Sequence, residues 1–138
     1  MKPHGTRSDY ETQRFTELLQ AFRECMRKLK TTNMPDIYKA VVMSPTSRFW
    51  VSEERTAIVL SRMEHGDQLD EMRPQKKEMF CEIYRRCLKL KEREPDLSWL
   101  ELATKVVAQP APRWYLAPDS ARLLIYKAKR WIKSKTSH

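Results

Sequence analysis

Apolar residues recur every three or four positions in six stretches of the chain, which is the spacing of one face of an α-helix. Helices are predicted over about 9–30 and, as a shorter element, over about 35–43. A third helix begins after Ser52 and ends near 65–67, and the remaining three are predicted at 74–93, after Ser98, and at 118–133. The inward face of the first helix is predicted to hold Phe15, Leu18, Leu19, Phe22, Met26 and Leu29.

Residues that favour helix ends stand at the boundaries of these stretches. Ser52 can accept a hydrogen bond from an early helix amide, and Ser98 with Glu101 has the spacing of a capping box. Pro35 and Pro74 suit first turns, where the missing N–H is not needed. The pattern therefore predicts short, defined connections between helices.

One stretch of the chain occurs twice, at an offset of 65 positions. Residues 41–63 read VVMSPTSRFWVSEERTAIVLSRM, and residues 106–128 read VVAQPAPRWYLAPDSARLLIYKA. Both combine two valines, a proline, an Arg-aromatic-aromatic segment and an apolar helix in one order, and ten further aligned pairs are conservative. The identical pairs are Val41/Val106, Val42/Val107, Pro45/Pro110 and Arg48/Arg113. The match indicates an internal duplication.

The predicted fold is mostly α-helical, with a duplicated three-helix unit. Each half holds a Pro-containing turn and a short extended Arg-aromatic-aromatic segment, in a first unit at 9–65 and a second at 74–133. Because each unit alone is too small to bury its apolar stripes, we expect the halves to share one compact domain over 1–138, with flexible ends at 1–8 and 134–138. Pairing of the two extended segments as an antiparallel ribbon is a further alternative.

Composition removes several classes of function. Two glycines in 138 residues leave no backbone for a phosphate-binding loop, and three histidines and three cysteines form no recognisable ligand or nucleophile motif. We therefore expect no enzyme activity, no catalytic residues, no metal and no cofactor. No apolar run is long enough for a membrane span, so we expect no membrane partner and a cytoplasmic location.

Net charge points toward an anionic partner. The chain carries +9, of which residues 113–138 carry +6 and residues 73–93 carry +5. The last helix has no acid after Ser120, and its inward stripe leaves Arg122, Tyr126, Lys129 and Lys133 on one outer face, with Lys127 and Arg130 beside it. The helix at 73–93 is a weaker candidate, because its acids lie among its basic residues and can pair with them. An ordinary solvated surface is the alternative interpretation.

Two interpretations are open for the repeated Arg-aromatic segments. In one, the aromatic residues at 49–50 and 114–115 pack the joint between the units while the arginines pair or cap. In the other, Arg48 and Arg113 bind phosphate and an aromatic ring stacks on a base.

The sequence LELATKVVAQPAPRWYLAPDSARLLIYKAKR resembles the helix-turn-helix of DNA-binding proteins, over about 30 residues. The resemblance implies a recognition helix at 118–133 that docks in the major groove. The turn at 109–117 departs from the family, since it is longer than the usual three or four residues and is prolyl and aromatic.

Together these features predict a small basic nucleic-acid-binding protein, with duplex DNA ahead of RNA as its partner. A regulator or an accessory factor of a mobile element would both fit. The alternatives are an interaction or assembly module for an acidic protein or a nucleoprotein complex, and an RNA-binding accessory protein.

Overall fold

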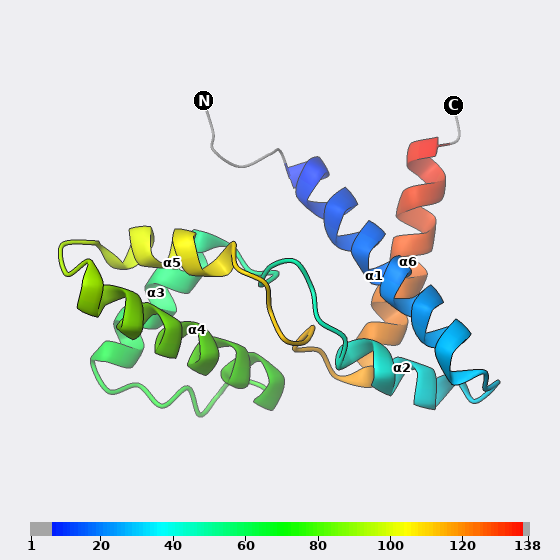
Figure 1. Cartoon of the computed structure of the whole chain (residues 1–138), viewed down its shortest axis with the longest axis horizontal. Coiled ribbons are helices and arrows are strands. Elements are labelled where there is room, and N and C mark those ends of the chain that lie inside the picture. Colours follow the sequence, from blue (N-terminus) through cyan, green and yellow to red (C-terminus); the bar gives the residue numbers. More distant parts are fainter. Residues whose placement is uncertain (1–6, 137–138) are drawn as a thin grey trace. The chain divides into compact units, whose positions relative to one another are not determined.

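The part of the chain that the structure describes folds into six α-helices (Figure 1). A computed structural model describes residues 7–136, with side chains from 9 to 135, and within this part of the chain there is no β-strand. The predicted, mostly α-helical fold is confirmed. The helices are α1 (Arg7–Leu29), α2 (Met34–Val42), α3 (Glu53–Glu64), α4 (Pro74–Arg93), α5 (Trp99–Val107) and α6 (Pro118–Thr136).

Helix ends follow the residues that predicted them. The Ser52 hydroxyl accepts the Arg55 amide at 3.1 Å at the start of α3. At α5 the capping box is complete, because Ser98 Oγ accepts from the Glu101 amide and the Glu101 carboxylate accepts from the Ser98 amide. After α3, Gly66 adopts φ +96°, a left-handed conformation that glycine tolerates and that lets its amide bond to Met63 O.

The chain divides into two compact units. Unit 1 comprises residues 1–44 and 116–138 and contains α1, α2 and α6, whereas unit 2 is residues 45–115 and contains α3, α4 and α5. This division differs from the expected single domain of tandem units at 9–65 and 74–133. Each unit combines the first two helices of one half with the third helix of the other half.

The two Pro-containing linkers explain this exchange. They run antiparallel and meet at one β-bridge, in which the amides and carbonyls of Thr46 and Ala111 bond to each other at 3.0 and 2.9 Å. The Phe49 amide also donates to Val107 O at 2.9 Å. Because of their prolines, the extended linkers do not continue the preceding helices, and each third helix packs in the other unit. The alternative of a two-stranded ribbon reduces to this single bridge.

Aromatic residues of the linkers pack within unit 2. Phe49 stacks with Tyr115, and Trp50 with Trp114, each pair with ring centroids 6.0 Å apart. Phe49, Trp114 and Tyr115 are buried. Tyr115 has φ 56°, a strained value for a residue with a side chain, which the surrounding packing must hold. Burial and stacking favour the packing interpretation of these segments.

Unit 1 has its own core. In Figure 1, α1 and α6 lie side by side, and α2 packs against both near the end of α1 and the start of α6. The large apolar side chains of α1 and α2 meet small and branched residues of α6. The buried residues are Phe15, Leu18, Leu19, Phe22, Cys25, Ile37, Tyr38, Val41, Val42, Ala121, Ile125 and Ala128.

Some predictions of inward faces and helix ends were wrong. Met26 and Leu29 are exposed at the end of α1. Both residues lie in the last two turns of α1, next to the connection to α2. The helices also extend further than expected at both ends, to Arg7 and Thr136. The remaining ends expected to be flexible, 1–6 and 137–138, lie outside the described residues.

The helix pair that resembles a helix-turn-helix is divided between the units. The ten residues at 108–117 separate α5 from α6, with α5 in unit 2 and α6 in unit 1, where it packs on α1 and α2. A helix-turn-helix requires a short turn that holds its two helices together. The connection between α5 and α6 is longer than such a turn, and the relation between these two helices that the resemblance implies stays a prediction.

Candidate nucleic-acid interface

Helix α6 has the two faces that its sequence predicts. Ala121, Ile125 and Ala128 are fully buried against α1 and α2. Tyr126, Lys129 and the basic residues that follow on the opposite side are exposed, whereas Arg122 is half-buried. The outer face of α6 is thus a basic surface on a packed helix.

A pocket of about 490 Å³ lies between the first turn of α2 and the first three turns of α6, within unit 1. Three cationic and two tyrosine side chains line it, together with apolar residues and one carboxylate. The lining residues are Met34, Pro35, Tyr38, Lys39, Pro118, Asp119, Arg122, Tyr126 and Lys129. We call this the α2–α6 pocket.

The two tyrosines of the α2–α6 pocket act on each other. Burial, then a hydrogen bond with Tyr126, raises the pKa of Tyr38. A hydrogen bond from Tyr38, followed by one from Arg122, lowers the pKa of Tyr126. The Arg122 guanidinium also lies 5.9 Å from the centre of the Tyr126 ring. These contacts hold the Tyr126 hydroxyl in a fixed, electropositive setting.

Helix α1 contacts two of the residues that line the α2–α6 pocket. The Phe22 ring stacks on Tyr38 at 6.1 Å with an angle of 11° between the planes, and the Lys129 ammonium lies 5.0 Å from the Phe22 ring centre. Both Phe22 and Tyr38 are buried. The packing of α1 therefore positions Tyr38 and the stem of Lys129 at the pocket.

Two further cations of α6 project from the helix. Lys127 and Arg130 are exposed, and within residues 9–135 no carboxylate forms an ion pair with them or with Arg122 or Lys129. Lys133 is exposed one turn beyond Lys129 and contacts other residues of the chain. Four cations of α6, namely Arg122, Lys127, Lys129 and Arg130, are therefore not paired with a carboxylate of the described chain.

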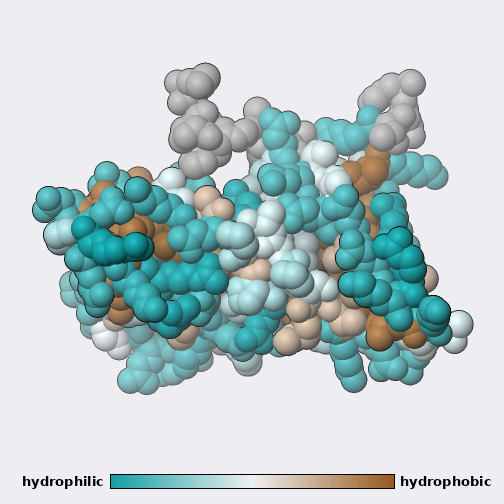
Figure 2. Space-filling view, viewed as in Figure 1, coloured by the Kyte–Doolittle hydropathy of each residue, from teal (hydrophilic) through white to brown (hydrophobic). Residues whose placement is uncertain are grey.

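Charge is divided unequally between the units. Unit 1 has 14 basic and 6 acidic residues, a formal charge of +8, and unit 2 has 13 basic and 12 acidic residues, a formal charge of +1. On the visible face, hydrophilic side chains cover most of both units, and hydrophobic ones appear in small separate patches (Figure 2). The two units are thus similar in the hydropathy of the visible surface, but they differ clearly in net charge.

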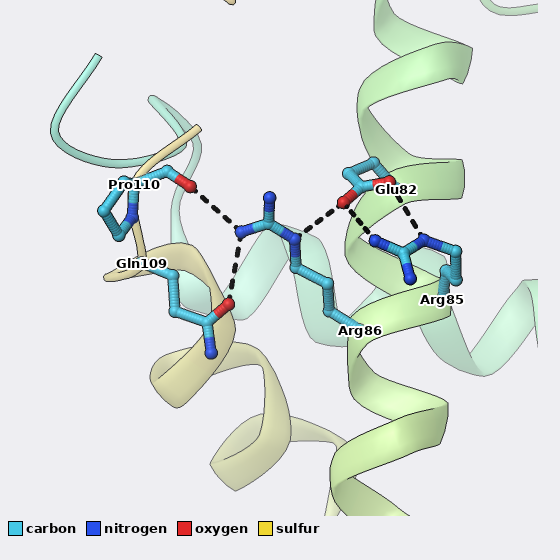
Figure 3. A network of polar contacts seen from close by, with 5 residues as sticks. All are labelled: Glu82, Arg85, Arg86, Gln109 and Pro110. Atoms are coloured by element: carbon cyan, nitrogen blue, oxygen red, sulfur yellow. Dashed lines mark hydrogen bonds and ion pairs between the residues drawn. The ribbon is translucent and has the colours of Figure 1, made fainter. Parts of the chain in front are cut away.

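The basic residues of unit 2 are largely occupied within that unit. Figure 3 shows Arg85 and Arg86 both bound to Glu82, with shortest distances of 2.7 Å. Arg86 also donates to Pro110 O and Gln109 Oε1 at 3.0 and 3.2 Å, so it fastens the second linker to α4. The Arg85 hydrogen bond, then the one from Arg86, lowers the pKa of Glu82. The predicted local pairing on this helix is confirmed.

Arg48 and Arg113 belong to unit 2, and their contacts favour the structural interpretation. Arg48 donates to the carbonyls of Phe49 and Val51 at 3.0 and 3.1 Å and lies over the Trp50 ring. Arg113 forms an ion pair with Glu78 at 2.7 Å and lies 5.4 Å from the Tyr115 ring centre. The structure thus brings Arg122, Tyr126 and Lys129 together at one pocket, and it leaves these two arginines outside that group.

Sequence analysis missed the contribution of α2. Tyr38 and Lys39 line the pocket, but they lie in a short helix. Neither its length nor its net charge indicates a binding site. A signal exists at the offset of 65 positions just before the two similar stretches, because the residues that correspond to Tyr38 and Lys39 are Ala103 and Thr104, neither aromatic nor charged. A chemical difference between aligned copies marks a position that packing alone does not require.

Other kinds of site find no support in the described residues. They contain no group of three or more His, Cys, Asp or Glu side chains that could hold a metal ion, and no helix long and apolar enough to cross a membrane. Cys81 is exposed, while Cys25 and Cys87 are buried, and burial raises the pKa of the Cys87 thiol to about 12. A thiol with that pKa is protonated and unreactive at neutral pH.

Comparison with protein-family models, with curated proteins and with solved structures finds no match for this chain.

Proposed function

We propose that this chain binds nucleic acid, with duplex DNA as the principal partner, through the α6 face of unit 1. One observation carries the proposal: nearly all the net positive charge belongs to unit 1, where Arg122, Lys127, Lys129 and Arg130 of α6 form no ion pair with a described carboxylate. A row of cations on a rigid helix can follow a phosphate backbone and release its counterions.

Helix spacing supports the same function. Lys127 and Arg130 are one turn apart, and the pocket cations Arg122 and Lys129 flank them on the adjacent strip of α6. Since the helix is anchored by the buried Ala121, Ile125 and Ala128, these cations are presented on a surface that is already ordered. An ordered cationic surface loses less conformational entropy on binding than a flexible basic tail.

We also propose that the chain is a duplicated three-helix unit whose second copy supplies the binding helix. The offset of 65 positions relates the bounds of α2 to those of α5, and the first residue of α3 to that of α6. Buried positions agree at the same offset, as in Phe15/Phe80 and Ile37/Leu102. The exposed pair Ile58 and Leu123 agrees as well, at 56% and 58% exposure.

The test of nucleic-acid binding removes charge outside the pocket. We expect the double variant Lys127→Gln, Arg130→Gln to weaken binding to all duplex sequences and to flatten the salt dependence by about 0.9 log units for each phosphate that the protein no longer neutralises. The fold should persist, because both side chains are exposed and form no ion pair with a described carboxylate. Fluorescence anisotropy with duplex DNA, single-stranded DNA and RNA at several salt concentrations measures the effect.

A matched control is available on α4 of unit 2. Lys89→Gln, Arg93→Gln removes the same charge from exposed positions that also form no ion pair with a described carboxylate. Equal affinities for the α6 variant and the parent at low and moderate salt would refute the proposal. Equal weakening by the α4 variant would show that net charge, and not α6, determines binding.

A further inference from the structure

The α2–α6 pocket has a chemistry that simple contact with a phosphate backbone does not use. Backbone phosphates lie on the surface of a duplex and can be met by exposed lysines alone. Here a hollow of about 490 Å³, within the size range of small-ligand sites, is formed beside such lysines. Its volume and lining suit a ligand that enters between the helices.

The lining combines an anion-binding part with an apolar part. Lys39, Arg122 and Lys129 supply three positive charges against the single carboxylate of Asp119. Arginine can bind phosphate through two parallel hydrogen bonds, while each lysine acts as a point charge. Met34 with two prolines forms the apolar part. The expected ligand therefore carries both a negative group and an apolar surface.

Tyr126 offers a surface for stacking. Its side chain is 46% exposed, yet it contacts Arg122 at the ring and Tyr38 at the hydroxyl. Tyr38 is in turn fixed by its stack on Phe22. A ring that is exposed and already oriented can stack on a base with little loss of rotamer freedom.

We infer that the α2–α6 pocket binds one unpaired nucleotide of the nucleic acid, with its phosphate on Arg122, Lys129 and Lys39 and its base against Tyr126. A base within a duplex is stacked on its neighbours and cannot enter a pocket, so the nucleotide must come from a single-stranded end or gap. This inference rests on the nucleic-acid binding proposed above and names the part of the partner that the pocket would recognise.

Three ligands separate the sources of this chemistry. They are a blunt duplex, the same duplex with a three-nucleotide single-stranded overhang, and a free nucleoside monophosphate. We expect the parent protein to bind the overhang duplex more tightly than the blunt one. Tyr126→Ala should weaken overhang binding by about 5- to 150-fold, the range for removal of one stacked base, and weaken blunt-duplex binding less.

Two variants on the same helix act as controls. Tyr126→Phe keeps the ring and should retain the overhang preference. Leu123→Ala changes a side chain that is 58% exposed and does not line the pocket, so it should match the parent. Circular dichroism and thermal unfolding establish that each variant is folded.

The outcomes distinguish the pocket from the wider proposal. Binding to blunt duplex that depends on Lys127 and Arg130, without any preference for the overhang, would overturn the nucleotide pocket and leave the proposed function standing. Equal weakening of both duplexes by Tyr126→Ala would also overturn it. Binding of the free nucleotide that Tyr126→Ala abolishes, in a protein that binds no strand, would support the ligand class and overturn the proposed function.

Discussion

Unit 1 and unit 2 are each built from one long helix, one helix of nine residues and a third helix, but they differ at the place where the third helix meets the short one. In unit 1 this place is the α2–α6 pocket. The positions 65 away from Arg122, Tyr126 and Lys129 are Ala57, Ser61 and Glu64 in α3. Two cations and a tyrosine are thus matched by two small residues and an acid.

The nine-residue helices differ in the same way. Position 99 of α5 holds a tryptophan, where α2 has Met34, and its indole N–H donates to Glu64 at 3.1 Å, while Lys91 lies 4.6 Å from its ring centre. Position 103 holds alanine where α2 has Tyr38. In unit 2, the Trp99 side chain therefore makes contacts with Glu64 and Lys91 at the position that corresponds to the α2–α6 pocket of unit 1. One helical plan can serve either for internal packing or for a ligand, depending on a few surface positions.

The largest expected effect is a loss of stability in unit 2, and it tests the internal packing of that unit. Trp114 is 5% exposed and stacks on Trp50, so Trp114→Ala should reduce the free energy of unfolding by about 3–5 kcal/mol. Because both rings belong to unit 2, amide hydrogen exchange should rise there first. Thermal unfolding and exchange measured by mass spectrometry test this. Leu100→Ala, at an exposed position, serves as the control. An unchanged melting temperature for Trp114→Ala would contradict the expected contribution of the buried Trp114 ring to the packing of unit 2.

A second variant replaces three residues of the α2–α6 pocket by the residues at the corresponding positions of unit 2. Arg122→Ala, Tyr126→Ser, Lys129→Glu gives the pocket the residues of α3, and we expect affinity for an overhang duplex to fall by about 30-fold, or roughly 2 kcal/mol. The matched variant Lys89→Ala, Arg93→Glu on α4 removes the same three units of charge. If both variants weaken binding equally, the pocket has no role beyond its charge.

The smallest expected effect is a loss of stability of unit 2 at acidic pH. Backbone and arginine hydrogen bonds lower the pKa of Asp67, and contacts with Ser98 lower the pKa of Glu101; both carboxylates, like Glu82, belong to unit 2. A carboxyl with a lowered folded pKa stabilises the fold above its unfolded pKa, and this stabilisation is lost as the pH falls through the folded value. Between about pH 5 and pH 3, unit 2 should therefore loosen before unit 1. Amide NMR spectra across this range resolve the two units, and earlier disappearance of unit 1 signals would refute the expectation.

Local features of the fold could be predicted from the sequence. Helix bounds follow from apolar spacing and from residues such as Ser52, Ser98 and Pro74, because these act within one turn of the backbone. The outer face of α6 follows for the same reason. Met26 and Leu29 fit the apolar stripe but are exposed, since the pattern gives no information about where the neighbouring helix ends.

Long-range features could not be predicted. Which third helix packs on which pair depends on the course of two extended linkers, and their contacts at Thr46 and Ala111 join residues 65 apart. The pocket is similarly formed by residues of α2 and α6 that are about 85 positions apart, so no local pattern marks it. Comparison of the two similar stretches is the one sequence signal that reaches across this distance.

The exchange of third helices sets an order in which the molecule can assemble during its synthesis. Unit 2 is continuous, so it can fold once residue 115 has left the ribosome, and its bridge between Thr46 and Ala111 then brings the two ends of a 71-residue insertion together. This closure removes most of the entropy that would oppose the meeting of α2 with α6. The basic surface and its pocket form only after α6 has emerged, so in this order the proposed binding site is completed after unit 2 has folded.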